Sequence, residues 1–134
     1  MQLYAGLGCR RGCSAPALAA LLAQTLLLHD LPLAALAGLA SIELKRDEPG
    51  LHQLAQQLGV PLVFFTAGQL AAFEARLSHR SAVSFAHTGC HGVAESSALA
   101  LAEHCASAPS LLRVPRTLQA DASLALAWAP PFGG

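Results

Sequence analysis

The amino-acid sequence predicts an α/β fold: a single three-layer domain over residues 1–134, with a mostly parallel sheet of about five to six strands and helices on both faces. Three observations support this prediction. The length suits one domain with a hydrophobic core. Short apolar runs of strand type alternate with longer apolar runs of helical type, which is the pattern of parallel strands joined by helices. Polar residues gather just after the predicted strands, where ligands bind in such folds.

The first half of the chain predicts three strand–helix units. Ser14 is a suitable N-cap for the first helix, and Leu31-Pro32 interrupts the helical pattern after it. Pro49 favours the start of a helix that ends at Gly59, and the apolar run that follows suits a strand buried on both faces. The predicted elements are strands over 3–7, 39–44 and 60–65, helices over 15–28, 49–59 and 69–77, and a helical turn over 33–36.

The second half of the chain predicts three further strands and one long helix. A fourth strand is expected over 82–86, followed by a second glycine-bearing turn over 88–92. That turn opens a helix from 93 to about 105. The last two strands are expected over 111–114 and 123–128, with Pro115 and Asp121 near their connection.

A glycine-rich turn that carries Arg10 and Arg11 joins the first strand to the first helix. Gly8 and Gly12 let the backbone approach a ligand closely, the helix start offers unpaired N–H groups, and arginines suit carboxylate or phosphate. The turn therefore predicts an anion site, unless the glycines only turn the chain and the arginines are solvated. Because the spacing departs from the dinucleotide fingerprint and no Gly-Lys-Ser/Thr follows, a nucleotide-binding module, with Glu43 as ribose partner, is a weaker possibility.

Other polar residues also lie where a predicted strand leads into a helix, and few lie where a helix leads back into a strand. We expect the two glycine turns to face one cleft at the carboxyl edge of the sheet. The polar residues in or just after strand-to-helix turns are Arg10, Arg11, Lys45, Asp47, Glu48, Thr66, His87, Thr88, His91, Glu95 and Ser96.

The candidate reactive residues each have a structural alternative. Glu95 could act as an acid or base, or it could complement the helix dipole as the third residue of a helix with Gly92 as N-cap. Glu48 or Asp47 could cap the helix that follows them. Cys9 lies near a helix N-terminus and beside an arginine, which favours its thiolate and makes it a candidate nucleophile.

The cysteines do not predict a disulfide framework, because we expect the chain to be cytoplasmic. They are Cys9, Cys13, Cys90 and Cys105. His87 and His91 could join the first three as ligands for zinc or cobalt, but free cysteines are more often small buried hydrophobes. No resident metal and no cofactor is therefore predicted.

The amino-acid composition limits the kinds of partner that the chain is expected to bind. Charged residues make up 12% of the chain and the formal net charge is zero, so the footprint of a nucleic-acid-binding protein is absent. With 54% hydrophobic residues, the chain favours a homodimer or exposed apolar patches. Arg10-Arg11 before an apolar run resembles a twin-arginine signal, but the run ends at His29-Asp30 before it could span a bilayer. We expect a cytoplasmic protein that does not bind a membrane.

Three blocks of residues occur in a characteristic order. They are Gly6-x-Gly8-Cys9-Arg10-Arg11-Gly12, then Ala40-Ser41-Ile42-x-x-Lys45-x-x-Glu48-x-Gly50-Leu51, then Gly89-x-x-x-Val93-Ala94-Glu95-x-x-Ala98-Leu99. Together they resemble the CobE family of cobalamin biosynthesis. The same blocks are similar to the C-terminal part of CbiG, which opens a lactone ring in a cobalt-precorrin and releases acetaldehyde.

The resemblance implies a precorrin-type tetrapyrrole ligand with peripheral carboxylates, and other cobalamin-pathway enzymes as partners. A carrier or accessory role is favoured, and a small hydrolase or rearrangement enzyme that uses Glu95 and Cys9 is the alternative. The chain lacks the N-terminal region of the lactone-opening protein, and Arg116 stands where the family often has lysine. The expected ligand-binding residues are Gly8, Arg10, Arg11, Gly12, Lys45, Glu48, Thr88, Gly89 and Gly92.

Overall fold

The computed structural model describes residues 1–119 and 121–131, which form a mixed five-stranded sheet with strand order β3-β2-β1-β5-β4. The strands are β1 (Leu3–Cys9), β2 (Leu36–Ile42), β3 (Leu62–Phe65), β4 (Leu111–Gln119) and β5 (Ala122–Trp128). β1, β2 and β3 are parallel, whereas β5 is antiparallel to both β1 and β4. The α/β fold class is confirmed, and the parallel part of the sheet is its N-terminal half.

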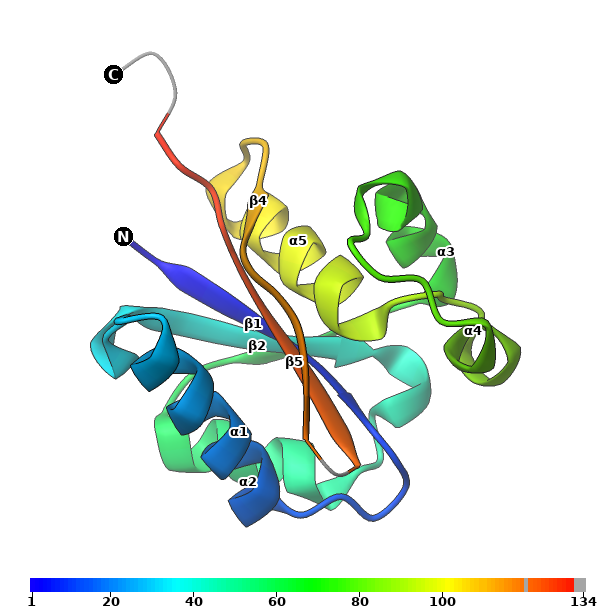
Figure 1. Ribbon diagram of the computed structural model, residues 1–134, viewed down its shortest axis with the longest axis horizontal. Helices are drawn as coiled ribbons and strands as arrows, with labels where there is room; N and C mark the ends of the chain where they lie inside the picture. The colour runs from blue at the N-terminus through cyan, green and yellow to red at the C-terminus, as the bar shows by residue number, and fades with distance from the viewer. Residues whose placement is uncertain (120, 132–134) are drawn as a thin grey trace.

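Helices cover both faces of the sheet, which confirms the three layers (Figure 1). The helices α1 (Ala15–Leu28) and α2 (Pro49–Leu58) pack on one face. The long helix α5 (Val93–Ala106) packs on the other, beside α3 (Ala67–Leu70), the 3₁₀ helix η3 (Ala71–Arg76) and α4 (Ala82–Thr88). Two more 3₁₀ turns, η1 (Leu33–Ala35) and η2 (Glu43–Lys45), flank β2. No helix in the described part of the chain is long and apolar enough to cross a membrane.

A separate hydrophobic core lies on each face of the sheet. Leucines of β1, α1 and α2, such as Leu7, Leu18 and Leu54, fill the first core. The second core lies under α5, which approaches β1 so closely that a Cβ at Gly6 would lie 1.8 Å from the carbonyl oxygen of Ala94. This contact places the start of α5 beside the carboxyl end of β1.

Local signals in the sequence explain the ends of the helices. The Ser14 hydroxyl accepts a hydrogen bond from the Ala17 N–H (3.2 Å), as predicted for the N-cap of α1. Gly59 ends α2 in the left-handed conformation, with φ = 68°. Thr66 and Gln69 form a capping box that starts α3.

The strand predicted over 82–86 is wrong, because these residues belong to the helix α4. The Ser81 hydroxyl caps the helix by accepting from the Ser84 N–H (3.1 Å), and Gly89 ends it with φ = 77°. Val83 is 70% exposed and Phe85 is 48% exposed, so the larger apolar side chains of this segment lie on the surface and not within the sheet. End caps therefore decide the structure of this segment over its apolar pattern.

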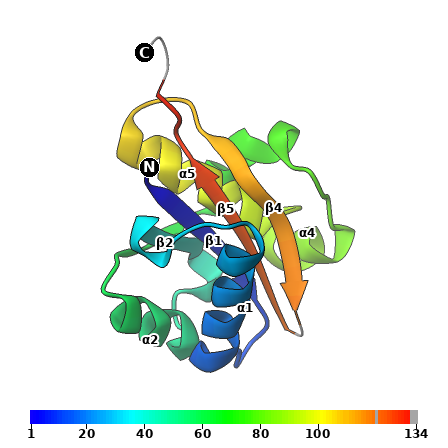
Figure 2. The same ribbon diagram turned by 60° about the vertical axis from the view of Figure 1, so that its left-hand side comes forward.

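The C-terminal part differs from expectation in direction and length. Among the described residues no helix lies between β4 and β5, and the two strands form the antiparallel hairpin drawn in orange and red in Figure 2. β4 is longer than predicted, and Pro115 lies within it, where the register of the hairpin shifts. Because the hairpin doubles back, Asp121 comes close to the glycine-rich turn, and the Arg10 N–H donates to its carbonyl oxygen (2.9 Å).

Candidate ligand-binding site

A cavity of about 990 Å³ opens at the carboxyl ends of β1 and β2. Its walls come from the glycine-rich turn after β1, the segment between β2 and α2, the helix α4 and the start of α5. The predicted site residues that line it are Gly8, Cys9, Arg10, Arg11, Gly12, Lys45, Glu48, Thr88 and Gly92. Two others, Glu95 and Gly89, do not line it. The volume lies at the upper end of the range for small-molecule sites.

Cationic side chains outnumber carboxylates in the wall of this cavity. The cations are Arg10, Arg11, Lys45 and Arg116, and the carboxylates are Asp47 and Glu48. Arg10 pairs only loosely with Asp121, at 3.6 Å between exposed side chains. The Nε atom of Arg116 is buried and has no hydrogen-bond partner among the described residues. This wall can therefore receive anionic groups through charge-assisted hydrogen bonds.

Glu48 fixes the glycine-rich turn instead of capping α2. Its carboxylate accepts a hydrogen bond from the Gly12 N–H (2.9 Å), and it makes no capping bond to the first turn of α2. Gly12 has φ = 81°, a conformation that glycine adopts without steric cost. Gly50 packs on the same turn, since a Cβ there would lie 2.3 Å from the Cys13 carbonyl oxygen. The two loops that carry Arg11 and Lys45 are thus held together.

Cys9 and Cys13 form a disulfide, which corrects the expectation of free thiols. The glycine-rich turn doubles back so that their Cα atoms lie 5.9 Å apart, a separation that suits a disulfide. A disulfide sulfur has no thiolate to offer, so the oxidised chain gives no nucleophile at Cys9. The cysteines that remain free are Cys90, which is buried, and Cys105, which is exposed.

Glu95 is the third residue of α5, whose N-cap is Gly92, and it is fully buried. Its carboxylate accepts from the N–H groups of Ser78 (2.7 Å), Arg116 (2.9 Å) and His79 (3.4 Å), and from the Ser78 hydroxyl. Burial alone would raise the pKa of Glu95, but these hydrogen bonds outweigh it and hold the pKa below its usual value. The carboxylate is therefore a buried anion that ties a loop and a strand to α5.

Thr88 and Gly89 shape the end of α4. The Thr88 hydroxyl donates to the Ser84 carbonyl oxygen (2.7 Å) and accepts from the Cys90 N–H (3.1 Å), so it stabilises the second glycine turn. The Cys90 Sγ lies 3.1 Å from the Ser96 hydroxyl. Over the described residues, no group of three or more His, Cys, Asp or Glu side chains could hold a metal ion.

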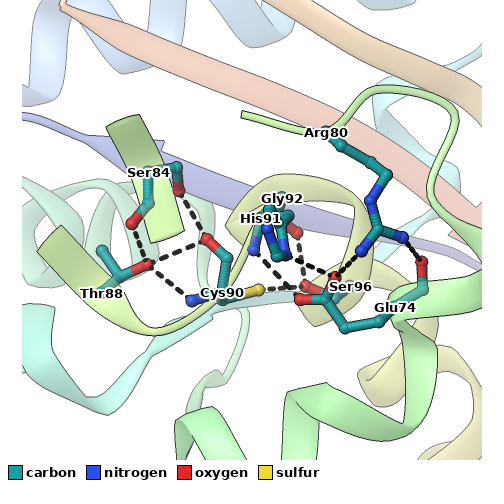
Figure 3. A network of polar contacts seen from close by, with 8 residues as sticks. All are labelled: Glu74, Arg80, Ser84, Thr88, Cys90, His91, Gly92 and Ser96. Carbon is teal, nitrogen blue, oxygen red and sulfur yellow. Dashed lines mark hydrogen bonds and ion pairs between the residues drawn. The ribbon is translucent and has the colours of Figure 1, made fainter. Parts of the chain in front are cut away.

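Sequence reasoning missed the contact between His91 and Glu74. Figure 3 shows the polar network that joins η3, α4 and the start of α5 through these side chains. Glu74 accepts from the His91 N–H (3.0 Å) and contacts its Nδ1 atom (2.9 Å), and it pairs with Arg80 (3.2 Å). Burial alone would raise the pKa of Glu74, but the bonds to His91 and the nearby charges hold it below its usual value. No spacing in the sequence signals this pair, because the partners lie on different elements.

The sequence matches one family model and is similar to several proteins of cobalamin biosynthesis. Residues 3–127 match the family model described as Cobalamin synthesis G C-terminus. The chain is 37% identical to Protein CobE of Sinorhizobium sp over 93% of its own length and 79% of that protein. It is also 47% identical to a cobalt-precorrin-5A hydrolase of Salmonella typhimurium, over 54% of this chain but only 21% of the hydrolase.

Solved structures agree with these matches. The crystal structure of CobE, a protein from the cobalamin (vitamin B12) biosynthetic pathway, superposes with a TM-score of 0.90 at 50% identity, covering 94% of this chain and 89% of that one. The cobalamin biosynthesis protein ChiG from Agrobacterium tumefaciens superposes with a TM-score of 0.73 at 30% identity, covering 96% of this chain and 99% of that one.

Proposed function

The chain belongs to the cobalamin synthesis G C-terminus family, and we propose that it binds a precorrin-type tetrapyrrole in the cavity, as a carrier or accessory factor of cobalamin biosynthesis. The observation that carries this proposal is the cationic wall. Arg11 and Lys45 have no ion-pair partner among the described residues, and both line the cavity. The acetate and propionate groups at the edge of a tetrapyrrole would supply the missing anions.

The helix α5 adds to the attraction for anions. Gly92, Val93 and Ala94 line the cavity at its N-terminus, where backbone N–H groups and the helix dipole favour negative charge. The Glu95 carboxylate lies in the same turn but does not line the cavity, and it is held by donors from the loop at Ser78 and from Arg116 on β4.

The state of the two predicted catalytic residues favours binding over catalysis. Glu95 is fully buried and its carboxylate already accepts from four donors, while Cys9 is joined to Cys13. Neither group is placed to act as a base or nucleophile toward a ligand in the cavity. The hydrolases that resemble this chain are much longer, since the matched segments cover only 21% and 25% of them. We propose that their activity requires regions outside the matched segment.

The test is an anaerobic absorbance titration with hydrogenobyrinic acid, a metal-free corrin whose periphery carries free acetic and propionic acid side chains. Arg11→Ala should weaken binding by about tenfold to a hundredfold, because one charge-assisted hydrogen-bonding group contributes roughly 1.5–3 kcal/mol. Arg11→Lys should recover part of the affinity, since the ammonium keeps the charge but loses the bidentate fork. Mass analysis of the recovered pigment should show no covalent change.

Arg113→Ala is the matched control. Arg113 is exposed on β4, lies over the Trp128 ring at 5.9 Å and does not line the cavity, so its loss should leave the affinity unchanged. Equal affinity in Arg11→Ala and Arg113→Ala would place the ligand elsewhere. A changed pigment mass would make the protein an enzyme.

A further inference from the structure

We propose that His91 supplies an axial nitrogen ligand to the cobalt ion of a cobalt-containing tetrapyrrole in the cavity. This inference rests on the proposed function and extends it, because it gives the protein a means to distinguish cobalt-containing from metal-free rings. The ring nitrogens of a tetrapyrrole fill the equatorial positions around its metal. One imidazole is then sufficient, and no protein cluster of metal ligands is needed.

The His91 ring is fixed from two sides. Its Nδ1 atom contacts the Glu74 carboxylate at 2.9 Å, and its backbone N–H donates to the other oxygen of the same carboxylate at 3.0 Å. The ring also stacks on Phe85, with centroids 4.3 Å apart and planes inclined by 19°. A side chain held in this way keeps its orientation when a ligand arrives.

The second ring nitrogen, Nε2, is the one that can ligate. The Glu74 carboxylate can only accept, so it selects the tautomer of the neutral imidazole that carries its proton on Nδ1 and its lone pair on Nε2. Nε2 has no hydrogen-bond partner among the described residues, and His91 lines the cavity with about a quarter of its side chain exposed. A carboxylate behind a histidine is the usual arrangement behind a metal-binding imidazole, where it orients the ring and raises its basicity.

Neighbouring polar groups of this wall are already engaged. The Ser84 hydroxyl donates to the Cys90 carbonyl oxygen (2.8 Å), and the Thr88 hydroxyl donates to the Ser84 carbonyl oxygen (2.7 Å). These hydroxyls do not offer a proton relay to His91. Ligation needs no relay: the Nε2 lone pair replaces a water molecule at the axial position, and no electron is transferred.

The test uses cobyrinic acid with cobalt as Co(II), and hydrogenobyrinic acid as its metal-free counterpart. In frozen-solution electron paramagnetic resonance, the wild-type complex should show each cobalt line split into a triplet by one nitrogen nucleus. Protein labelled with ¹⁵N should convert the triplet into a doublet. His91→Gln should lose the splitting, while His87→Gln, which removes another histidine of the cavity wall, should retain it.

The affinity for the two rings separates this inference from the proposed function. The wild-type protein should bind the cobalt ring more tightly by roughly tenfold or more, and His91→Gln should lose that preference, so that the variant binds the two rings with equal affinity. Glu74→Gln should reduce the preference by about tenfold, because the ring loses its charged partner. Unchanged urea midpoints confirm that each variant is folded.

Two results would overturn the inference while leaving the proposed function intact. Wild-type protein could bind both rings equally without nitrogen splitting, or the splitting could persist in His91→Gln. Failure of both rings to bind would instead refute the proposed function itself.

Discussion

The Glu95→Gln substitution tests whether the buried carboxylate holds the fold together. Glu95 is 0% exposed and accepts four hydrogen bonds from the Ser78, His79 and Arg116 segments. Glutamine has nearly the same shape, but one oxygen becomes an NH₂ group that can only donate. The substitution therefore changes hydrogen bonding and charge with little change in packing.

The expected loss follows from the donors on each oxygen. Oε2 accepts from the Ser78 hydroxyl and from the Arg116 N–H. If NH₂ takes that place, the hydroxyl can rotate to accept, but the Arg116 N–H is left facing a donor. One buried donor without a partner costs about 1–3 kcal/mol, and the remaining bonds lose their charge. We expect a destabilisation of about 2–4 kcal/mol near neutral pH.

The loss should depend on pH in a definite direction. The folded pKa of Glu95 lies below its unfolded value of about 4.3. The stabilisation from its charge is therefore complete above that value and is lost as the pH falls through the folded pKa. Urea unfolding of both proteins from about pH 7 downward should show the difference shrinking in acid, as the wild-type carboxylate becomes protonated.

Glu43→Gln is the control for this experiment. Glu43 forms a partly exposed pair with Arg46 on η2 (3.1 Å), and such pairs contribute little to stability. Its substitution should leave the urea midpoint nearly unchanged. A Glu95→Gln effect below about 0.5 kcal/mol, or one that grows as the pH falls, would show that the buried carboxylate does not anchor the loop and β4.

Alanine substitutions at two glycines should destabilise the protein by different amounts. Gly6→Ala should cost at least about 3 kcal/mol, because a Cβ would lie 1.8 Å from the Ala94 carbonyl oxygen and α5 would have to move off β1; an unchanged thermal midpoint would contradict this packing. Gly12→Ala meets no atom within 4 Å but adopts φ = 81°, so we expect a smaller loss of about 1–2 kcal/mol, measured by urea unfolding. A Gly12→Ala protein less stable than Gly6→Ala would reverse the argument.

The sequence was sufficient for much of the fold because its signals were local. Ser14 and Pro49 mark helix starts, and the polar residues after β1 and β2 do meet at one cavity. The strand predicted over 82–86 was wrong. Val83 and Phe85 alternate with smaller residues as in a strand, but Ser81 and Gly89 are residues that cap the two ends of a helix. Caps deserve more weight than apolar alternation when a run is this short.

The remaining parts of the site depend on tertiary contacts that no local pattern encodes. His91 meets Glu74 from across the second glycine turn, and Glu48 meets Gly12 across a separation of 36 residues. The disulfide between Cys9 and Cys13 was not predicted, because only the cellular compartment was used to judge the cysteines. The compartment does not determine how close a turn brings two cysteines to each other. Such contacts can be predicted only when the backbone positions of both partners are known.

The position of β5 has a consequence for how the protein is made. Although β5 is the last strand along the chain, it lies between β1 and β4. A nascent chain that has emerged only as far as α5 therefore exposes a long apolar edge of β1 with unpaired backbone groups, which can pair with another chain. Until residue 128 has left the ribosome, the centre of the sheet cannot close. The interval between the emergence of β1 and that of β5 is thus the period in which the chain is most exposed to pairing with another chain.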